Sequence, residues 1–218
     1  MMNKRFIHPV TLLFLLTLAA ALMSWVGSIY SWQGVQSLLS AEGMRWLLRN
    51  VVSLPWSASL IRHLFMLSFG VGLCVHSGWW ALCVRLITRK GGWSRKERRA
   101  WVLSMAVGVM WFAFCAWLAF GSSAIVRSIT GGLQGSPFMS GLSFLCSLGL
   151  GLTAMIYGLS VDFYRTDRDV VKGISYCFSR FSSLWVALFF IALLLSILHY
   201  TGLDAWLKID CLHSLVFF

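Results

Sequence analysis

Five long apolar stretches set the strongest constraint on the fold of this chain. They run from about Val10 to Tyr30, Ser59 to Leu86, Trp101 to Phe120, Phe138 to Val161 and Ser183 to Tyr200. Each is long enough to cross the roughly 30 Å hydrocarbon core of a bilayer, where a single segment satisfies its own backbone hydrogen bonds only as a helix. The sequence therefore predicts an all-α integral membrane protein with about five transmembrane helices. We expect residues 1–218 to form a single membrane domain.

The composition excludes the other broad classes of protein. Of the 218 residues, 59% are hydrophobic and 11% are charged, whereas about a quarter of a soluble domain is charged. The six cysteines contain no Cys-x-x-Cys pair and show no metal-ligand spacing with the five histidines. The chain also lacks a Ser, His and Asp set, a pair of membrane carboxylates and a Gly-rich phosphate loop. We therefore expect no metal, no cofactor and no enzyme activity.

The basic residues predict the orientation of the chain. With the N-terminus in the cytoplasm, thirteen of the 18 Lys and Arg residues fall on the inner side: Lys4, Arg5, Arg85, Arg89, Lys90, Arg95, Lys96, Arg98, Arg99, Arg165, Arg168, Lys172 and Arg180. The other five, which are Arg45, Arg49, Arg62, Arg127 and Lys208, fall outside. The positive-inside rule then predicts an N-in, C-out protein of the plasma (inner) membrane. Lipid headgroups are a sufficient partner for the inner bases, so the net charge of +11 does not indicate nucleic acid.

The two ends of the chain and the first linker carry smaller signals. Lys4 and Arg5 resemble the start of a signal peptide, but the apolar run continues to Tyr30 and favours a retained helix. In the linker, the segment from Ser40 to Trp46 predicts a short helix lying at the outer membrane interface, and we expect Pro55 to end it. The final segment, Thr201 to Phe218, is short and interrupted by charges, so half of a sixth span is the less favoured interpretation.

His76 is the one histidine near the depth of a bilayer. It lies on a stripe of residues spaced four apart in the second stretch, namely Ser68, Gly72, His76 and Trp80. An ionisable group inside a membrane is a functional candidate, because its burial costs free energy unless a partner or water receives it. The alternative, which we favour, is a neutral His76 that bonds a neighbouring Ser or a backbone carbonyl.

The fourth stretch has one face of small residues. Ser143, Ser147 and Gly151 follow one another at four-residue spacing. This pattern predicts close packing against another helix, and a pore lining is the second interpretation. At the inner end of the same stretch, we expect Arg165 to neutralise Asp162.

Three blocks of sequence, in order, resemble one known family. In the first block, His8 and Pro9 open the first stretch, and Leu38 to Trp46 reads LLSAEGMRW in the outer linker after it. In the second, Ser94 to Arg99 reads SRKERR before the third stretch. The third block consists of Ser136 to Met139 (SPFM), Ile156 to Gly158 (IYG), Asp167 to Lys172 (DRDVVK), Ser175 and Ser179. Together these blocks resemble the AbgT family, the p-aminobenzoyl-glutamate transporters. In the matched blocks we expect structural roles, with Pro137 starting a helix, Gly158 near its end, and Asp169 and Lys172 paired on a helix.

The resemblance implies a transporter of p-aminobenzoyl-glutamate or a related aromatic acid, with proton coupling left open. It does not supply the family's re-entrant hairpins and substrate site, so we expect a reduced member, and no family substrate residue can be carried over. The alternative is a non-transporting membrane scaffold, or an assembly or regulatory partner, that retains the family's support helices.

Under the transporter interpretation, three basic residues in or beside the spans are candidates for binding an anionic substrate: His76, Arg62 and Arg127. A homo-oligomer, such as a dimer, or a missing transporter subunit would then complete the pathway. The expected partners are thus the lipid bilayer, another protein chain and a small aromatic acid.

Overall fold

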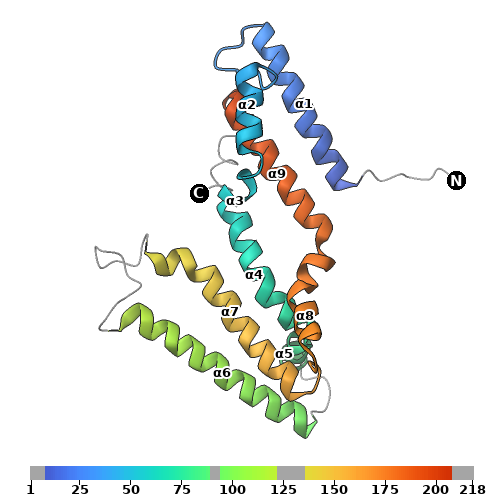
Figure 1. Ribbon diagram of the computed structural model, residues 1–218, viewed down its shortest axis with the longest axis vertical. Coiled ribbons are helices and arrows are strands. Elements are labelled where there is room, and N and C mark those ends of the chain that lie inside the picture. The colour runs from blue at the N-terminus through green and yellow to red at the C-terminus, as the bar shows by residue number, and fades with distance from the viewer. Residues whose placement is uncertain (1–7, 89–93, 122–135, 208–218) are drawn as a thin grey trace, which may run out of the picture. The chain divides into compact units, whose positions relative to one another are not determined.

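The computed structural model describes residues 8–88, 94–121 and 136–207, and their regular structure is entirely helical. Five of the described helices are long and apolar enough to cross a membrane, which confirms the predicted all-α membrane fold. The helices shown in Figure 1 are α1 (Pro9–Ile29), α2 (Ala41–Asn50), α3 (Leu54–Ser57), α4 (Ser59–His76), α5 (Trp79–Thr88), α6 (Arg95–Phe120), α7 (Pro137–Ser160), α8 (Asp167–Arg180), α9 (Ser182–Thr201) and α10 (Leu203–Leu207). The N-in, C-out orientation stays a prediction.

The chain divides into two compact units. The first comprises residues 1–62 and 181–218, and the second comprises residues 63–180. Helices α1, α2, α3, α9 and α10 belong to the first unit, and α5 to α8 belong to the second. Helix α4 begins in the first unit and continues into the second, so that its first turn and the rest of its length have different packing partners.

Helices α1 and α9 form the centre of the first unit. The rings of Phe14 and Phe190 meet edge to face with their centroids 5.7 Å apart, and Ala20 packs in one cluster with Ile197. Further along α1, the buried hydroxyl of Ser24 accepts a hydrogen bond of 3.1 Å from the backbone N–H of Leu38. This bond fastens the linker after α1 to the helix pair.

Helix α2 begins where the sequence predicts a helix start. The Ser40 side chain accepts a hydrogen bond of 3.0 Å from the Gly43 N–H, and the Trp46 ring stacks on Tyr200 of α9 at 4.1 Å. The expectation that Pro55 ends this helix is wrong. Helix α2 ends at Asn50, and Pro55 lies in the first turn of α3, where its missing N–H is not needed.

The turn between α9 and α10 depends on glycine. Gly202 has a φ of +73°, and a Cβ added to it would lie 2.2 Å from the carbonyl oxygen of Gly34. Beside it, the Gln36 N–H donates to the Thr201 carbonyl at 2.9 Å, and Trp32 stacks on Trp206 at 4.7 Å. The chain after α1 and the chain after α9 are therefore held together at this end of the unit. Residues 208–218, and with them the rest of the proposed sixth half-span, lie outside the described residues.

In the second unit, α4 and α7 approach each other to backbone contact. A Cβ added to Gly70 would lie 2.2 Å from the Ser147 carbonyl oxygen, and the Gly70 N–H donates to the Ser147 hydroxyl at 2.9 Å. Gly151 of α7 lies one turn further along the same crossing, against Leu73. The predicted close packing of the small face is thereby confirmed, and α4 is the helix that occupies it.

Helix α6 lies beside α7 (Figure 1) and packs against it through tryptophan. A Cβ added to Gly149 would lie 2.5 Å from Cδ1 of Trp111, whose indole N–H donates to the Leu145 carbonyl at 3.0 Å. Helix α8 covers another side of α4, where a Cβ added to Gly72 would lie 2.8 Å from the Gly173 carbonyl oxygen. Glycines thus allow each of these helices to pack closely.

The structure divides the apolar stretch from Ser59 to Leu86 into two helices. Helix α4 ends at His76, Gly78 has a φ of +77°, and the Ser77 hydroxyl accepts from the Trp79 N–H at 3.3 Å at the start of α5. The left-handed conformation of Gly78 interrupts the helical repeat. The predicted stripe of four-spaced residues is therefore wrong at Trp80, which lies beyond the break and is 58% exposed.

Substituting Gly70 with alanine tests the crossing of α4 and α7. The added methyl group collides with backbone, so we expect Gly70→Ala to destabilise the protein by about 1–3 kcal/mol. Gly141→Ala in α7 is the matched control, because a Cβ there meets nothing within 4 Å. The measurement is thermal unfolding of the purified chain in detergent. Equal melting temperatures for the two variants would contradict the crossing.

Candidate functional site

His76 lies in a group of aromatic rings at the end of α4. Its ring is 5.3 Å from Phe163, 5.9 Å from Tyr164 and 5.5 Å from Tyr176, measured between centroids. Its Nδ1 is 3.4 Å from the Tyr164 hydroxyl, and the side chain is partly exposed. The arrangement places an imidazole beside flat apolar surfaces at the break between α4 and α5.

The loop after α7 directs Tyr164 into this position. The N–H groups of Phe163 and Tyr164 both donate to the Gly158 carbonyl, at 2.8 and 3.2 Å, and Asp162 adopts a φ of +61° between them and the helix. An aspartate tolerates that left-handed conformation better than most residues with a Cβ. The chain therefore folds back over the end of α7.

Tyr164 fills the space left by two glycines. A Cβ added to Gly158 would lie 2.3 Å from the tyrosine ring, and one added to Gly173 would lie 2.6 Å from its hydroxyl. The side chain is 2% exposed, and its hydroxyl donates to the Leu73 carbonyl at 3.4 Å. Burial raises the pKa of Tyr164 to about 12, so the hydroxyl stays protonated at neutral pH.

The partner of His76 differs from the expected one. We expected a serine or a backbone carbonyl, and the structure places the Tyr164 hydroxyl there instead. The two residues are 88 positions apart in the sequence, and Tyr164 follows a helix end, so no periodic pattern connects them. The sequence signal that was available is the pair Gly158 and Gly173, whose missing side chains make room for the ring.

The other two candidate residues are not brought to His76. Arg62 is exposed near the start of α4, and His76 is the last residue of that helix. Their positions differ by 14, which corresponds to about 21 Å of helix rise. Arg127 lies outside the described residues. Arg62 and His76 therefore lie at opposite ends of α4.

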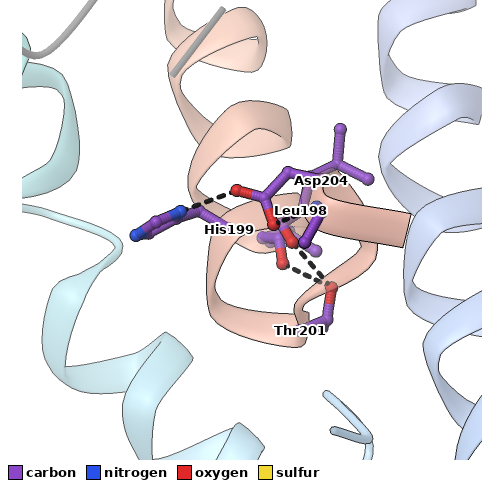
Figure 2. A network of polar contacts seen from close by, with 6 residues as sticks. Leu198, His199, Thr201 and Asp204 are labelled. Atoms are coloured by element: carbon purple, nitrogen blue, oxygen red, sulfur yellow. Dashed lines mark hydrogen bonds and ion pairs between the residues drawn. The ribbon is translucent and has the colours of Figure 1, made fainter. Parts of the chain in front are cut away.

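Figure 2 shows a second polar group, at the end of α9 in the first unit. The His199 Nδ1 is 2.7 Å from the carboxylate of Asp204, whose other oxygen accepts the Ala205 N–H at 2.9 Å. The Thr201 hydroxyl donates to the carbonyls of Ile197 and Leu198 at 2.7 and 3.2 Å. The Asp204 side chain is only 8% exposed, and burying a carboxylate requires such partners.

This pair was not predicted from the sequence, in which Asp204 is one of the charges that interrupt the segment from Thr201 to Phe218. His199 and Asp204 flank Gly202, whose left-handed φ reverses the chain and allows their side chains to meet. The glycine between these two residues is the sequence feature from which the turn could have been predicted.

Asp162 pairs with a base that was not expected. Its carboxylate accepts from the Lys96 ammonium at the start of α6, while the Arg165 Nε donates to the Asp162 backbone carbonyl at 3.2 Å. The hydrogen bond and the charge of Lys96 hold the pKa of Asp162 below its usual value. The ion pair joins the start of α6 to the loop after α7.

Several residues of the matched sequence blocks have structural roles. Ser94 and Glu97 form a capping box at the start of α6, and Pro137 opens α7 as expected. Asp169 caps α8, since its carboxylate accepts from the N–H and the hydroxyl of Thr166 at 3.2 and 2.9 Å. These bonds hold the pKa of Asp169 below its usual value, with a smaller contribution from Lys172.

Two cavities in the second unit are lined almost wholly by apolar side chains. One, of about 430 Å³, lies between α5, α6 and α7 and is lined by residues that include Trp79, Trp111 and Phe112. The other, of about 290 Å³, lies at the crossing of α4 and α7 and includes Phe69 and Phe144. No charged side chain is found in the lining of either cavity. Within the described residues, no three His, Cys, Asp or Glu side chains gather to hold a metal ion.

The comparisons with known proteins agree with this architecture. A family model described as "AbgT putative transporter family" matches residues 87–216, which is more than half of the chain. The fold is similar to that in the crystal structure of the Alcanivorax borkumensis YdaH transporter, whose reported topology is unusual. The TM-score is 0.76 at 15% sequence identity, and the match covers 94% of this chain and 73% of that chain. No curated protein sequence matches significantly.

The chain is therefore an integral membrane protein of a transporter class. It belongs to the AbgT transporter family. The resemblance read from the sequence blocks is confirmed, and the second and third blocks fall inside the matched segment. The family match favours a transporter over a scaffold that does not transport.

The ion pair of Asp162 predicts a dependence of stability on pH. Because the folded pKa of Asp162 lies below its usual value of 3.8, the stabilisation is complete above that pH and is lost as the pH falls through the lower, folded value. We expect Asp162→Asn to lower the melting temperature at neutral pH by a small amount, since the pair is solvent-exposed.

The measurement is the difference in melting temperature between the wild type and Asp162→Asn across a pH series. This difference closes below pH 3.8. Lys96→Gln is expected to show the same behaviour, and Asp167→Asn serves as a control that leaves the pair intact. A difference that stays constant down to acid pH would contradict the role of Lys96.

Proposed function

We propose that this chain carries p-aminobenzoyl-glutamate or a related aromatic acid across the plasma (inner) membrane, with transport coupled to protons. Membership of the AbgT transporter family supports transport as the activity. The observation that carries the substrate class is the position of His76 among the rings of Phe163, Tyr164 and Tyr176. Aromatic faces suit a substrate ring, and an imidazole supplies a hydrogen-bond donor or a charge for a carboxylate.

We assign Arg62 and His76 to different points of the substrate pathway. Their positions are about 21 Å apart in helix rise along α4. Arg62 is exposed near the start of the helix, where a permanent guanidinium charge attracts an anion before it enters. His76, at the other end of the helix, carries an ionisable imidazole and is our candidate for proton coupling. Arg127 stays a candidate from the sequence alone.

Uptake into vesicles tests this proposal. The purified chain is reconstituted and given labelled p-aminobenzoyl-glutamate with and without an imposed proton gradient, against empty vesicles. We expect saturable uptake that the gradient accelerates. We expect His76→Ala to reduce it by about tenfold or more, which corresponds to the loss of one charged hydrogen bond.

His63→Ala is the matched control for His76→Ala, because His63 lies on the same helix and is not part of the aromatic group. Arg62→Ala and Arg127→Ala are expected to raise the substrate concentration needed for half-maximal uptake. Flat traces from correctly inserted protein would contradict the proposal and favour the scaffold. If His76→Ala leaves the uptake and its pH profile unchanged, His76 has no part in the proposed transport.

We further propose that the working unit is a homo-oligomer, such as a dimer. The apolar cavities offer no cation to an anionic substrate, and a second chain would add further surfaces to the pathway. Helix α6 has apolar side chains to contribute, since Val109, Met110 and Phe112 are 68%, 70% and 76% exposed. In a membrane such a face packs against lipid or against another helix.

Light scattering on the chain in detergent measures its oligomeric state. For the dimer, we expect a protein mass of twice 24.5 kDa after subtraction of detergent. Phe112→Ala combined with Met110→Ala is expected to shift the population toward monomer, whereas Val171→Ala on α8 is a control at an exposed apolar position outside this face. A monomeric wild type with full uptake activity would contradict the proposal.

A further inference from the structure

Three arginines of α6 form a cationic surface above an apolar one. Arg95, Arg98 and Arg99 are all exposed, and Arg98 and Arg99 follow Arg95 by three and four residues, so the three share one side of the helix. The same side continues with Val102, Leu103 and Ala106, and these six residues line a hollow of about 690 Å³. We call them the arginine face.

The arginine face points away from the packed side of α6. Ala100 and Ser104, on the opposite side, are buried, and the Trp79 indole N–H of α5 donates to the Ser104 hydroxyl at 3.3 Å. Val102 and Leu103 remain 57% and 52% exposed. The face is therefore open to whatever surrounds the second unit.

The acidic residues closest in sequence are engaged elsewhere. The Glu97 carboxylate turns back to accept the Ser94 N–H at 3.0 Å, and Asp162 pairs with Lys96. Among the residues that the structure describes, no carboxylate forms an ion pair with Arg95, Arg98 or Arg99. Three adjacent guanidinium groups thus lack an acidic partner within the described chain.

The length of α6 places the two parts of this face at different depths. Its 26 residues span about 39 Å, which exceeds the roughly 30 Å of the hydrocarbon core. Because the apolar part of the helix occupies the core, its first turns reach the headgroup layer. Guanidinium groups bind phosphate through paired N–H donors, and Val102, Leu103 and Ala106 continue into the depth of the acyl chains.

We propose that the arginine face is a binding site for one anionic phospholipid of the bilayer. The phosphate lies against Arg95, Arg98 and Arg99, and an acyl chain follows the apolar residues below. This site includes neither Arg62 nor His76, and its occupant is a lipid that stays bound rather than a molecule that is transported.

Native mass spectrometry of the full chain in detergent tests the site, with dioleoyl phosphatidylglycerol and dioleoyl phosphatidylcholine as the two probes. We expect phosphatidylglycerol to bind one molecule per chain and phosphatidylcholine to bind much more weakly. Arg98→Gln combined with Arg99→Gln is expected to weaken phosphatidylglycerol binding by roughly 30-fold, from the usual contribution of two bases near an anionic surface. Arg98→Lys combined with Arg99→Lys keeps the charges but not the paired N–H donors, so it is expected to weaken binding less than the glutamine pair does.

Arg168→Gln combined with Arg180→Gln is the matched control, because it removes the same charge from exposed positions of α8. An equal loss of phosphatidylglycerol affinity in the control would show that only the net charge of the chain matters, and it would overturn the site. Equal binding of the two lipids would overturn it as well. Competition by inorganic phosphate or glycerol phosphate at the same concentrations would identify a soluble anion as the ligand instead. A change from oligomer to monomer without a change in lipid affinity would identify a contact between chains.

Discussion

The packing of the second unit depends on the contact of α4 with α7 at Gly70 and Ser147. In lipid, the hydrophobic effect does not hold helices together, so close van der Waals contact and hydrogen bonds between helices do so. Gly70 supplies both, because its missing side chain lets the Ser147 backbone approach and its N–H donates to the Ser147 hydroxyl. Larger residues at either position would separate the helices, and the position of His76 at the end of α4 depends on the same crossing.

The aromatic group around His76 also depends on glycines that allow close packing. Gly158 and Gly173 leave the space that Tyr164 fills, and the chain reverses at Asp162 to bring the ring there. The tyrosine then contacts α4, α7 and α8 at one point. A histidine at a helix end would otherwise be a mobile surface group, whereas here one of its ring nitrogens and one of its ring faces are defined by Tyr164. The proposed binding of an aromatic acid rests on this feature of the second unit.

Carboxylates are few in this chain, which has only seven Asp and Glu residues against 18 Lys and Arg. Asp162 pairs with Lys96, Asp204 with His199, and Asp169 and Glu97 bond the first turns of their own helices. These assignments use most of the described carboxylates for structure. The arginines that remain, above all those at the start of α6, are then left to interact with groups outside the chain, and a membrane surface provides such groups as phosphates.

The sequence alone determined the class of the protein, the number of spanning helices and the family. It could do so because apolar length, helix caps and ordered motifs are local properties: Ser40, Ser94 and Pro137 mark helix starts wherever the helices are packed. Only the tertiary structure decided the helix break at Gly78, the partner of His76 and the pairs of Asp162 and Asp204. Gly78 and Asp162 adopt a positive φ, but the residue type alone does not show which glycine or aspartate in a chain will do so. Tyr164 meets His76 across 88 residues because two glycines, Gly158 and Gly173, make room for its ring. Contacts of this kind depend on which backbones approach each other, and no periodicity in the sequence carries that information.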